Sequence, residues 1–141
     1  IISTGMATIA ELDETVRTVR ENGCEQLVLL KCTSTYPATP ENSNVLTIPH
    51  MRELFGCEVG LSDHTMGVGV AVAAVAHGAT VIEKHFTLRR ADGGVDSAFS
   101  LEPEEMVPTE NPSHHHTDAS RSRVALKGQS DEGLLVHAHR P

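Results

Sequence analysis

The sequence has no tryptophan, one tyrosine and three phenylalanines among its 141 residues, and all four aromatic rings precede residue 106. No apolar run approaches the roughly 20 residues that a membrane-spanning helix needs, so no membrane partner is expected. The first residues also lack the basic-then-apolar layout of a secretory signal. These absences predict a cytoplasmic protein with one modest hydrophobic core.

Cysteine and basic residues are also scarce. The three cysteines, Cys24, Cys32 and Cys57, are odd in number and lie in or beside apolar segments, which favours reduced thiols over a disulfide framework. Lysine and arginine number 11 against 19 acidic residues, and the net charge of −8 argues against binding to nucleic acid. An anionic ligand is still compatible with this charge, because backbone N–H groups and hydroxyls can hold a phosphate.

The composition changes after residue 106, which we take as a domain boundary. Residues 1–106 carry 7 basic and 15 acidic side chains, which accounts for the whole net charge. Residues 107–141 contain five of the nine histidines and no aromatic ring, and we expect this segment to be a divergent, poorly ordered tail. Its prolines at 108 and 112 are expected to break any helix there. The three histidines at 114–116 are more typical of a solvated run than of a metal site.

Helical and strand patterns alternate along residues 1–106. Thr8 and Glu11 have the spacing of a capping box, and apolar residues then recur at helical intervals until Gly23. Short apolar runs, typical of strands buried on both faces, occur between the helices. The predicted helices after the first are 45–55 and 68–75, and the predicted strands are one just before Ser3, then 27–30, 59–61 and one starting at 80.

This alternation predicts an α/β fold with a parallel sheet, either a TIM barrel or a doubly wound sheet. Every predicted strand ends in a polar cluster, and a barrel site is built from the ends of many strands, whereas a doubly wound sheet concentrates its site at a switch point. No Gly-x-Gly-x-x-Gly or Gly-Lys-Ser/Thr loop is present. We therefore predict half of a TIM (β/α)₈ barrel.

His64 and His85 are the sharpest candidate pair. Each follows a buried strand, and neighbouring strands lie about 4.8 Å apart, so the two imidazoles can share one divalent cation. Asp63 or Glu83 is a candidate acceptor for the remaining ring N–H of a ligating histidine. The alternative is that each histidine is an ordinary hydrogen-bonded structural group.

Three other segments are candidates for ligand contacts. Ser3, Thr4 and Gly5 form a hydroxyl-rich turn before a helix that can present donors to a phosphate, although Ser and Thr are also common helix-start residues. Tyr36 offers a ring face and a hydroxyl in a loop whose path a proline constrains. Residues 92–96 form either a mobile substrate loop with two carboxylates or a simple turn.

Taken together, five strings resemble the sialic acid synthase family in order and spacing, over residues 1 to about 106. The string at residues 90–100 is most similar to pseudaminic acid synthases. The five strings are Ser3-Thr4-Gly5-Met6, Lys31-Cys32-Thr33-Ser34-Thr35-Tyr36-Pro37, Gly60-Leu61-Ser62-Asp63-His64-Thr65, Val81-Ile82-Glu83-Lys84-His85-Phe86-Thr87 and Phe99-Ser100-Leu101-Glu102-Pro103.

The resemblance implies a bacterial cytoplasmic transferase that condenses phosphoenolpyruvate with an open-chain acylamino hexose, releases phosphate and forms a nonulosonic acid. It also implies that His64 and His85 bind Mn²⁺ or Mg²⁺. It places Ser3, Thr4, Ser34 and Ser62 around the substrate. Tyr36 and Asp96 are the implied catalytic residues, and Asp96 also contacts the sugar.

Measured against this family, residues 1–106 are expected to be the C-terminal half of the barrel, without the preceding βα units or the following antifreeze-like domain. The intact family member is expected to be a homodimer. Two rival functions remain. One is a catalytically inactive half-barrel that docks to a complementary half or to itself, since half a barrel leaves two sheet edges unpaired. The other is a metal-dependent aldolase of a different barrel family.

Overall fold

A single sheet with intervening helices organises the chain. The computed structural model describes residues 1–110, 123–127 and 134–136, with side chains described up to residue 106. In these residues the strands follow one another in the sheet in the order of the sequence; the first five are parallel and β6 is antiparallel to β5. The strands are β1 (Ile2–Ser3), β2 (Val28–Cys32), β3 (Glu58–Asp63), β4 (Val81–His85), β5 (Arg123–Lys127) and β6 (Leu134–Val136).

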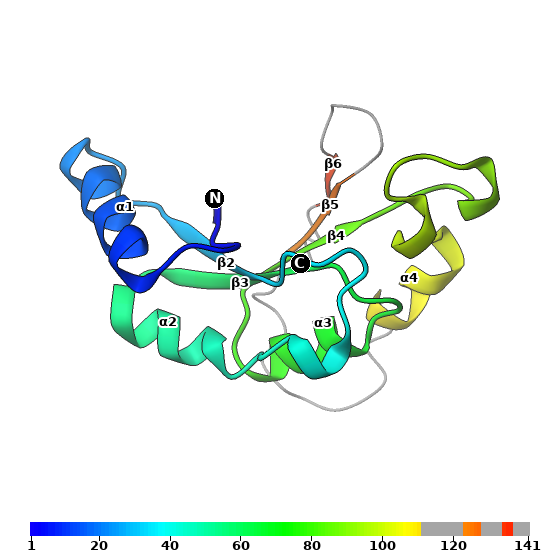
Figure 1. Cartoon of the computed structure of the whole chain (residues 1–141), viewed down its shortest axis with the longest axis horizontal. Coiled ribbons are helices and arrows are strands. Elements are labelled where there is room, and N and C mark those ends of the chain that lie inside the picture. Colours follow the sequence, from blue (N-terminus) through cyan, green and yellow to red (C-terminus); the bar gives the residue numbers. More distant parts are fainter. Residues whose placement is uncertain (111–122, 128–133, 137–141) are drawn as a thin grey trace.

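The helices form an arc along the sheet (Figure 1). The four α-helices of the described residues are α1 (Ile9–Glu21), α2 (Thr47–Phe55), α3 (Gly69–Ala76) and α4 (Pro103–Glu110), and the short 3₁₀ turns are η1 (Pro40–Asn42), η2 (Arg90–Asp92) and η3 (Ser97–Phe99). Neighbouring parallel strands in sequence order are the arrangement of a βα barrel, whereas a doubly wound sheet reverses its order at a switch point. The predicted α/β fold with a parallel sheet is confirmed.

The capping box at the start of α1 shows how local sequence defines a helix. The Thr8 hydroxyl accepts a hydrogen bond from the backbone N–H of Glu11 at 3.3 Å, and the Thr8 N–H donates to the Glu11 carboxylate at 2.7 Å. Two backbone donors that the helix cannot satisfy internally are thus paired. The helix then buries Leu12 and Val16 against the sheet.

Alternation along the strands separates the two faces of the sheet. Leu29, Val59, Leu61 and Ile82 belong to one apolar cluster with the buried side chains of α1, α2 and α3. Because side chains alternate along a strand, the residues between them point to the opposite face. The helix-facing side therefore holds the core, and the opposite side is available for a site.

Gly60 in β3 allows the strands to pack closely on that opposite face. A Cβ placed on Gly60 would collide with the backbone carbonyl of Val81 and would lie 2.7 Å from Cδ2 of Leu30. The glycine is required here by the approach of β4, whose carbonyl cannot move without disturbing the sheet.

Two arginines tie consecutive βα units together at the carboxyl ends of the helices. The guanidinium of Arg20 in α1 donates to the carbonyls of Phe55 and Gly56 at the end of α2, at 2.8 and 2.9 Å. Arg52 in α2 donates in the same way to the carbonyl of Gly78, after α3. Each arginine binds carbonyls at the end of the next helix along the chain, which have no partner within that helix. Its positive charge also lies at the negative end of that helix dipole.

One sequence expectation needs correction. Residues 107–112 were expected to break any helix, but α4 extends from Pro103 to Glu110, through Pro108. The helix starts upstream, where Pro103 is a favourable first residue and the Glu105 carboxylate accepts from the N–H of Glu102 at 2.8 Å. One proline then removes a single hydrogen bond, and the helix ends two residues beyond it. The predicted disorder of residues 107–141 falls mostly outside the described residues and stays a prediction.

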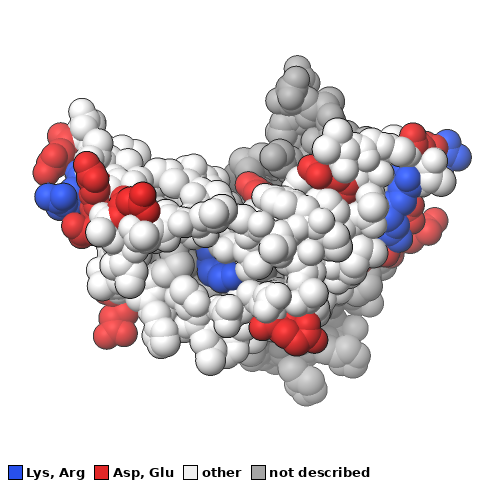
Figure 2. Space-filling model, in the orientation of Figure 1, with Lys and Arg blue, Asp and Glu red and all other residues white. Residues whose placement is uncertain are grey.

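Charged side chains gather at the two ends of the molecule on the face in Figure 2, over α1 and over the region of α4. The surface between them is mostly uncharged, apart from a basic group at the centre and an acidic cluster below it. Among the described residues, no helix combines the length and the apolar character needed to span a bilayer.

Candidate functional site

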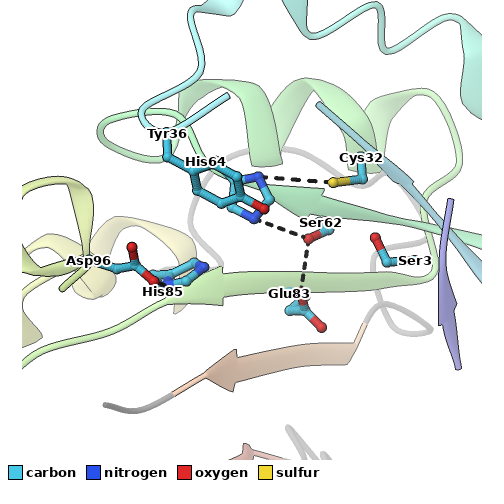
Figure 3. A pocket seen from close by; sticks show the side chains of 8 residues that line it. All are labelled: Ser3, Cys32, Tyr36, Ser62, His64, Glu83, His85 and Asp96. Carbon is cyan, nitrogen blue, oxygen red and sulfur yellow. Dashed lines mark hydrogen bonds and ion pairs between the residues drawn. The ribbon is translucent and has the colours of Figure 1, made fainter. Parts of the chain in front are cut away.

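A cavity of about 330 Å³ lies at the carboxyl ends of the first four strands. The side chains around it come from β1 to β4 and from the loops that follow β2 and β4, and Figure 3 shows them directed toward a common space. The lining residues are Ser3, Cys32, Tyr36, Ser62, His64, Glu83, His85 and Asp96.

Side chains two positions apart on a strand point to the same face, and this places two pairs of the lining residues on the cavity side. Ser62 and His64 lie two positions apart at the end of β3, and Glu83 and His85 lie two positions apart at the end of β4. Ser62 and Glu83 are register partners, and the Ser62 hydroxyl donates to the Glu83 carboxylate at 2.8 Å. The same hydroxyl lies 3.5 Å from Nε2 of His64, so the two strand ends share one polar network.

The two histidine rings face each other across the β3–β4 junction. Their centroids are 5.3 Å apart and the ring planes make an angle of 63°. Nδ1 of His64 lies 3.0 Å from the carbonyl oxygen of Thr33. A carbonyl cannot donate, so Nδ1 carries the proton and Nε2 is the basic nitrogen of the neutral ring. Nδ1 of His85 lies 3.5 Å from the carboxylate of Asp96.

The backbone after each histidine strand holds a loop against the cavity. The carbonyl of His64 accepts from the N–H of Ala38 at 2.9 Å, and the carbonyl of His85 accepts from the N–H of Leu101 at 2.8 Å. The first bond brings Tyr36, which precedes the cis-proline at position 37, onto His64 with a centroid distance of 4.3 Å. The second holds the segment that carries Asp96.

Phe99 completes the aromatic side of the site. Its ring lies 5.1 Å from that of His85, 5.9 Å from that of Tyr36 and 6.4 Å from that of His64, measured between centroids. The side chain is buried, with 6% of the residue exposed. An apolar ring beside two imidazoles restricts their rotation and excludes water from one side of the site.

Burial and neighbouring groups shift the pKa values of His64, Cys32 and Tyr36 in the cavity. Burial alone lowers the pKa of His64, but its hydrogen bonds to the Cys32 sulfur and the Thr33 carbonyl outweigh burial and raise it. The hydrogen bond from His64 lowers the pKa of the Cys32 thiol to about 7, against the opposing effect of burial. Burial first, and then the nearby Cys32 and Asp96 charges, raise the pKa of Tyr36, so its phenol stays protonated near neutral pH.

The structure brings six of the eight predicted site residues together and leaves two outside the lining. Thr4 is buried and its hydroxyl donates to the carbonyl of Leu30 at 2.9 Å, so it closes the β1–β2 junction and does not face the cavity. Ser34 is exposed and is not among the lining residues, although its hydroxyl lies 3.9 Å from the Cys32 sulfur. The six that line the cavity are Ser3, Tyr36, Ser62, His64, His85 and Asp96.

Sequence reasoning did not place Cys32 in the site, and it considered Glu83 only as an acceptor for a histidine N–H. The signal that places Glu83 was available, because a residue two positions before His85 on a strand shares its face. The suggestion that Asp63 serves a histidine is wrong. The Asp63 carboxylate accepts from the N–H and hydroxyl of Thr65 at 2.9 and 2.8 Å and from Lys84 at 2.9 Å.

The donors in the cavity suit a divalent cation held by few protein ligands. No cluster of three or more His, Cys, Asp and Glu with metal-site spacing occurs among the described residues. Each imidazole has an oxygen acceptor at Nδ1, a carbonyl for His64 and a carboxylate for His85, as metal-binding histidines commonly do. Two imidazole ligands leave the remaining coordination positions to waters or substrate oxygens, the donors that manganese and magnesium prefer. The residues therefore fit such an ion.

Comparisons with known proteins identify the family. The NeuB family model matches residues 1–119. An uncharacterised protein of Methanocaldococcus jannaschii is 47% identical over 140 residues, 99% of this chain and 42% of that protein. The pseudaminic acid synthase of Campylobacter jejuni is 49% identical over 105 residues, 74% of this chain and 31% of that protein. This chain therefore belongs to the NeuB family.

The solved structures show the same fold. The crystal structure of the spore coat polysaccharide biosynthesis protein SpsE from Bacillus subtilis matches with a TM-score of 0.72 and 40% identity, over 74% of this chain and 30% of that one. The chain thus spans less than half the length of each of these three relatives. The first two sequence matches also extend past residue 106, where the sequence analysis placed a domain boundary.

Proposed function

We propose that this chain forms part of a nonulosonic acid synthase, which condenses phosphoenolpyruvate with an open-chain acylamino sugar and releases phosphate. The observation that carries the proposal is the convergence of His64, His85, Glu83 and Asp96 on one cavity at the strand ends. The 49% identity to a pseudaminic acid synthase supports a product of the pseudaminic type.

In this reaction C3 of phosphoenolpyruvate bonds to the aldehyde carbon of the sugar, and the aldehyde oxygen takes up a proton. Water adds at C2 and phosphate leaves, so the product is a nine-carbon α-keto acid. His64 and His85 would hold a divalent cation, Mn²⁺ or Mg²⁺. When bound, such an ion polarises a carbonyl as a Lewis acid and orients substrate oxygens.

Hydroxyls and carboxylates of the cavity have separate tasks in this proposal. Ser3 would donate a hydrogen bond to the carboxylate or phosphate oxygens of phosphoenolpyruvate, since its side chain faces the cavity from β1. The protonated phenol of Tyr36 would donate to the sugar. Asp96 would accept from a sugar hydroxyl, and Glu83, held by the Ser62 hydroxyl at 2.8 Å, would accept a proton from the attacking water.

Within the described part of the chain, the cavity lining has no lysine or arginine to balance a substrate phosphate. Lys31 and Lys84 are buried and alternate with the lining residues, so they lie on the helix-facing side. We propose that the cations needed for a substrate phosphate come from the remaining βα units of a closed (β/α)₈ barrel.

Turnover by a barrel that joins this chain to the preceding βα units of a family member tests the proposal, because the cavity lining described for this chain includes no lysine or arginine for the substrate phosphate. Phosphoenolpyruvate, an N-acylated amino hexose and Mn²⁺ should together yield phosphate and a nine-carbon keto acid, detected by a phosphate assay and mass spectrometry. His64→Ala and His85→Ala should abolish both signals, and His50→Ala, an exposed histidine on α2, should not. An adduct formed without phosphate loss would support a different barrel aldolase. No turnover would support an inactive half-barrel.

A further inference from the structure

We propose that Asp63, Thr65 and Lys84 form a brace on the helix-facing side of the sheet that sets the positions of His64 and His85. Lys84 Nζ donates to the Asp63 carboxylate at 2.9 Å and to the backbone carbonyl of Thr65 at 2.6 Å. All three residues are buried, with 2%, 1% and 3% exposed for Asp63, Thr65 and Lys84. They do not line the cavity, so they act through the histidines beside them.

One carboxylate fixes the backbone on both sides of His64. Oδ1 of Asp63 accepts from the backbone N–H of Thr65 at 2.9 Å and from its hydroxyl at 2.8 Å. These bonds close a tight turn around the intervening residue, in the manner of an Asx turn. The direction in which His64 leaves β3 is thereby set by the residues before and after it.

The ion pair transfers this constraint to the second histidine. Asp63 and Lys84 are register partners in the parallel β3–β4 pair, and each directly precedes one of the two histidines. The Lys84 ammonium donates both to the Asp63 carboxylate and to the carbonyl of Thr65. The residues on both sides of His64 are therefore tied to the residue before His85. A slip or rotation of either strand end would have to break a buried, charge-assisted hydrogen bond.

Stability alone is a weak explanation for this pair. Burying two charges costs free energy that their attraction roughly offsets, and neutral replacement of both partners is often harmless to stability. A binding site, in contrast, needs its ligands held within about 0.5 Å by supporting residues. That the two histidines bind a cation rests on the proposed function. That the brace positions their rings does not depend on it.

Three variants of the full chain separate positioning from stability. Lys84→Met removes the charge, and Asp63→Asn with Lys84→Met removes both charges while Asn can still accept from Thr65. Val16→Ala in α1 is the matched control, since it destabilises a buried position remote from the site. Urea unfolding gives stability, loss of the free Mn²⁺ signal in electron paramagnetic resonance gives affinity, and ¹⁵N-edited imidazole spectra of the metal-free chain give the histidine tautomers.

We expect Lys84→Met to weaken Mn²⁺ binding by about 10-fold or more, the usual effect of removing support from metal ligands. The double variant should regain the unfolding midpoint of the unaltered chain but not its affinity, and Val16→Ala should lose stability but not affinity. In the metal-free chain, His64 should carry its proton on Nδ1, and Lys84→Met should mix its tautomers.

Full affinity in the double variant together with unchanged histidine spectra would overturn the brace. If the unaltered chain does not bind Mn²⁺, the result would instead overturn the proposal that His64 and His85 hold a divalent cation. The spectra of metal-free Lys84→Met would still decide the brace: a change in the His64 and His85 signals supports it, and identical spectra reject it.

Discussion

The sulfur of Cys32 lies 4.0 Å from Nδ1 of His64 in the wall of the cavity. The hydrogen bond from His64 lowers the pKa of this thiol from its ordinary 9.0 to about 7. Thiolates react with alkylating agents and thiols do not. In the metal-free chain, the rate of iodoacetamide modification of Cys32 should therefore rise with pH around a midpoint of about 7, as measured by peptide mass spectrometry.

Cys57 is the internal control for this titration. Burial raises its pKa, so its modification should rise only in more alkaline buffer than that of an ordinary thiol. His64→Ala should shift the Cys32 midpoint upward, because the first cause of the lowered pKa is removed. Equal midpoints for Cys32 and Cys57 would contradict the contact with His64.

Ser62→Ala should slow keto acid formation by roughly 10-fold, since a hydrogen bond to a charged group contributes about 1.5 kcal/mol. The variant removes the hydroxyl that holds Glu83 at 2.8 Å, whereas its contact with Nε2 of His64 is a longer one, at 3.5 Å. Ser43→Ala is the matched control, because Ser43 is equally buried and its hydroxyl binds the carbonyl of Thr39 at 3.1 Å, away from the lining. Equal rates for the two variants would remove Glu83 from the proposed mechanism.

Gly60→Ala should lower the free energy of unfolding by about 1–3 kcal/mol or more, the cost of forcing a methyl group into a filled space. The added Cβ meets the Val81 carbonyl and a methyl of Leu30. Gly69→Ala offers the comparison, because a Cβ there meets nothing within 4 Å at the start of α3. Urea unfolding should give a lower midpoint for the first variant only, and a neutral Gly60→Ala would show that the sheet can widen.

The Arg90–Glu105 pair gives a pH-dependent prediction. The hydrogen bond from Arg90 lowers the pKa of Glu105 below its ordinary 4.5. A lowered carboxyl pKa stabilises the fold above pH 4.5, and that contribution is lost as pH falls through the lowered value. Glu105→Gln should thus reduce the urea midpoint at pH 7 and have little effect in strong acid. Asp13→Asn, at the exposed pair with Arg17, should change neither.

Elements whose signals lie within a few residues were predictable from the sequence. The capping box of Thr8 and Glu11 and the apolar runs of the strands are local features, and α1 to α3 and β1 to β4 all form at the predicted segments. Helix α4 was not predictable in the same way, because Arg90 and Glu105, which are 15 residues apart, stabilise its first turn together.

The candidate site, too, was predictable only where its signals are local in the sequence. Polar residues at strand ends indicated the cavity, and six of them line it. Thr4 and Ser34 do not line it: the Thr4 hydroxyl binds the Leu30 carbonyl, and Ser34 lies beyond the end of β2, where strand alternation no longer assigns a face. Phe99 was not assigned to the site, because long-range backbone hydrogen bonds of Leu101, to His85 and to Thr87, bring that loop back to the end of β4.

Sequence by itself determined the alternation of helices and strands and the position of a polar group at each strand end, because apolar periodicity and capping act between near neighbours. Tertiary structure decided which of those polar groups meet. Asp63 and Lys84 lie 21 residues apart, and only parallel pairing of β3 with β4 makes them partners and brings the two imidazole centroids to 5.3 Å. Contacts across strands depend on register, and register is set by the whole sheet.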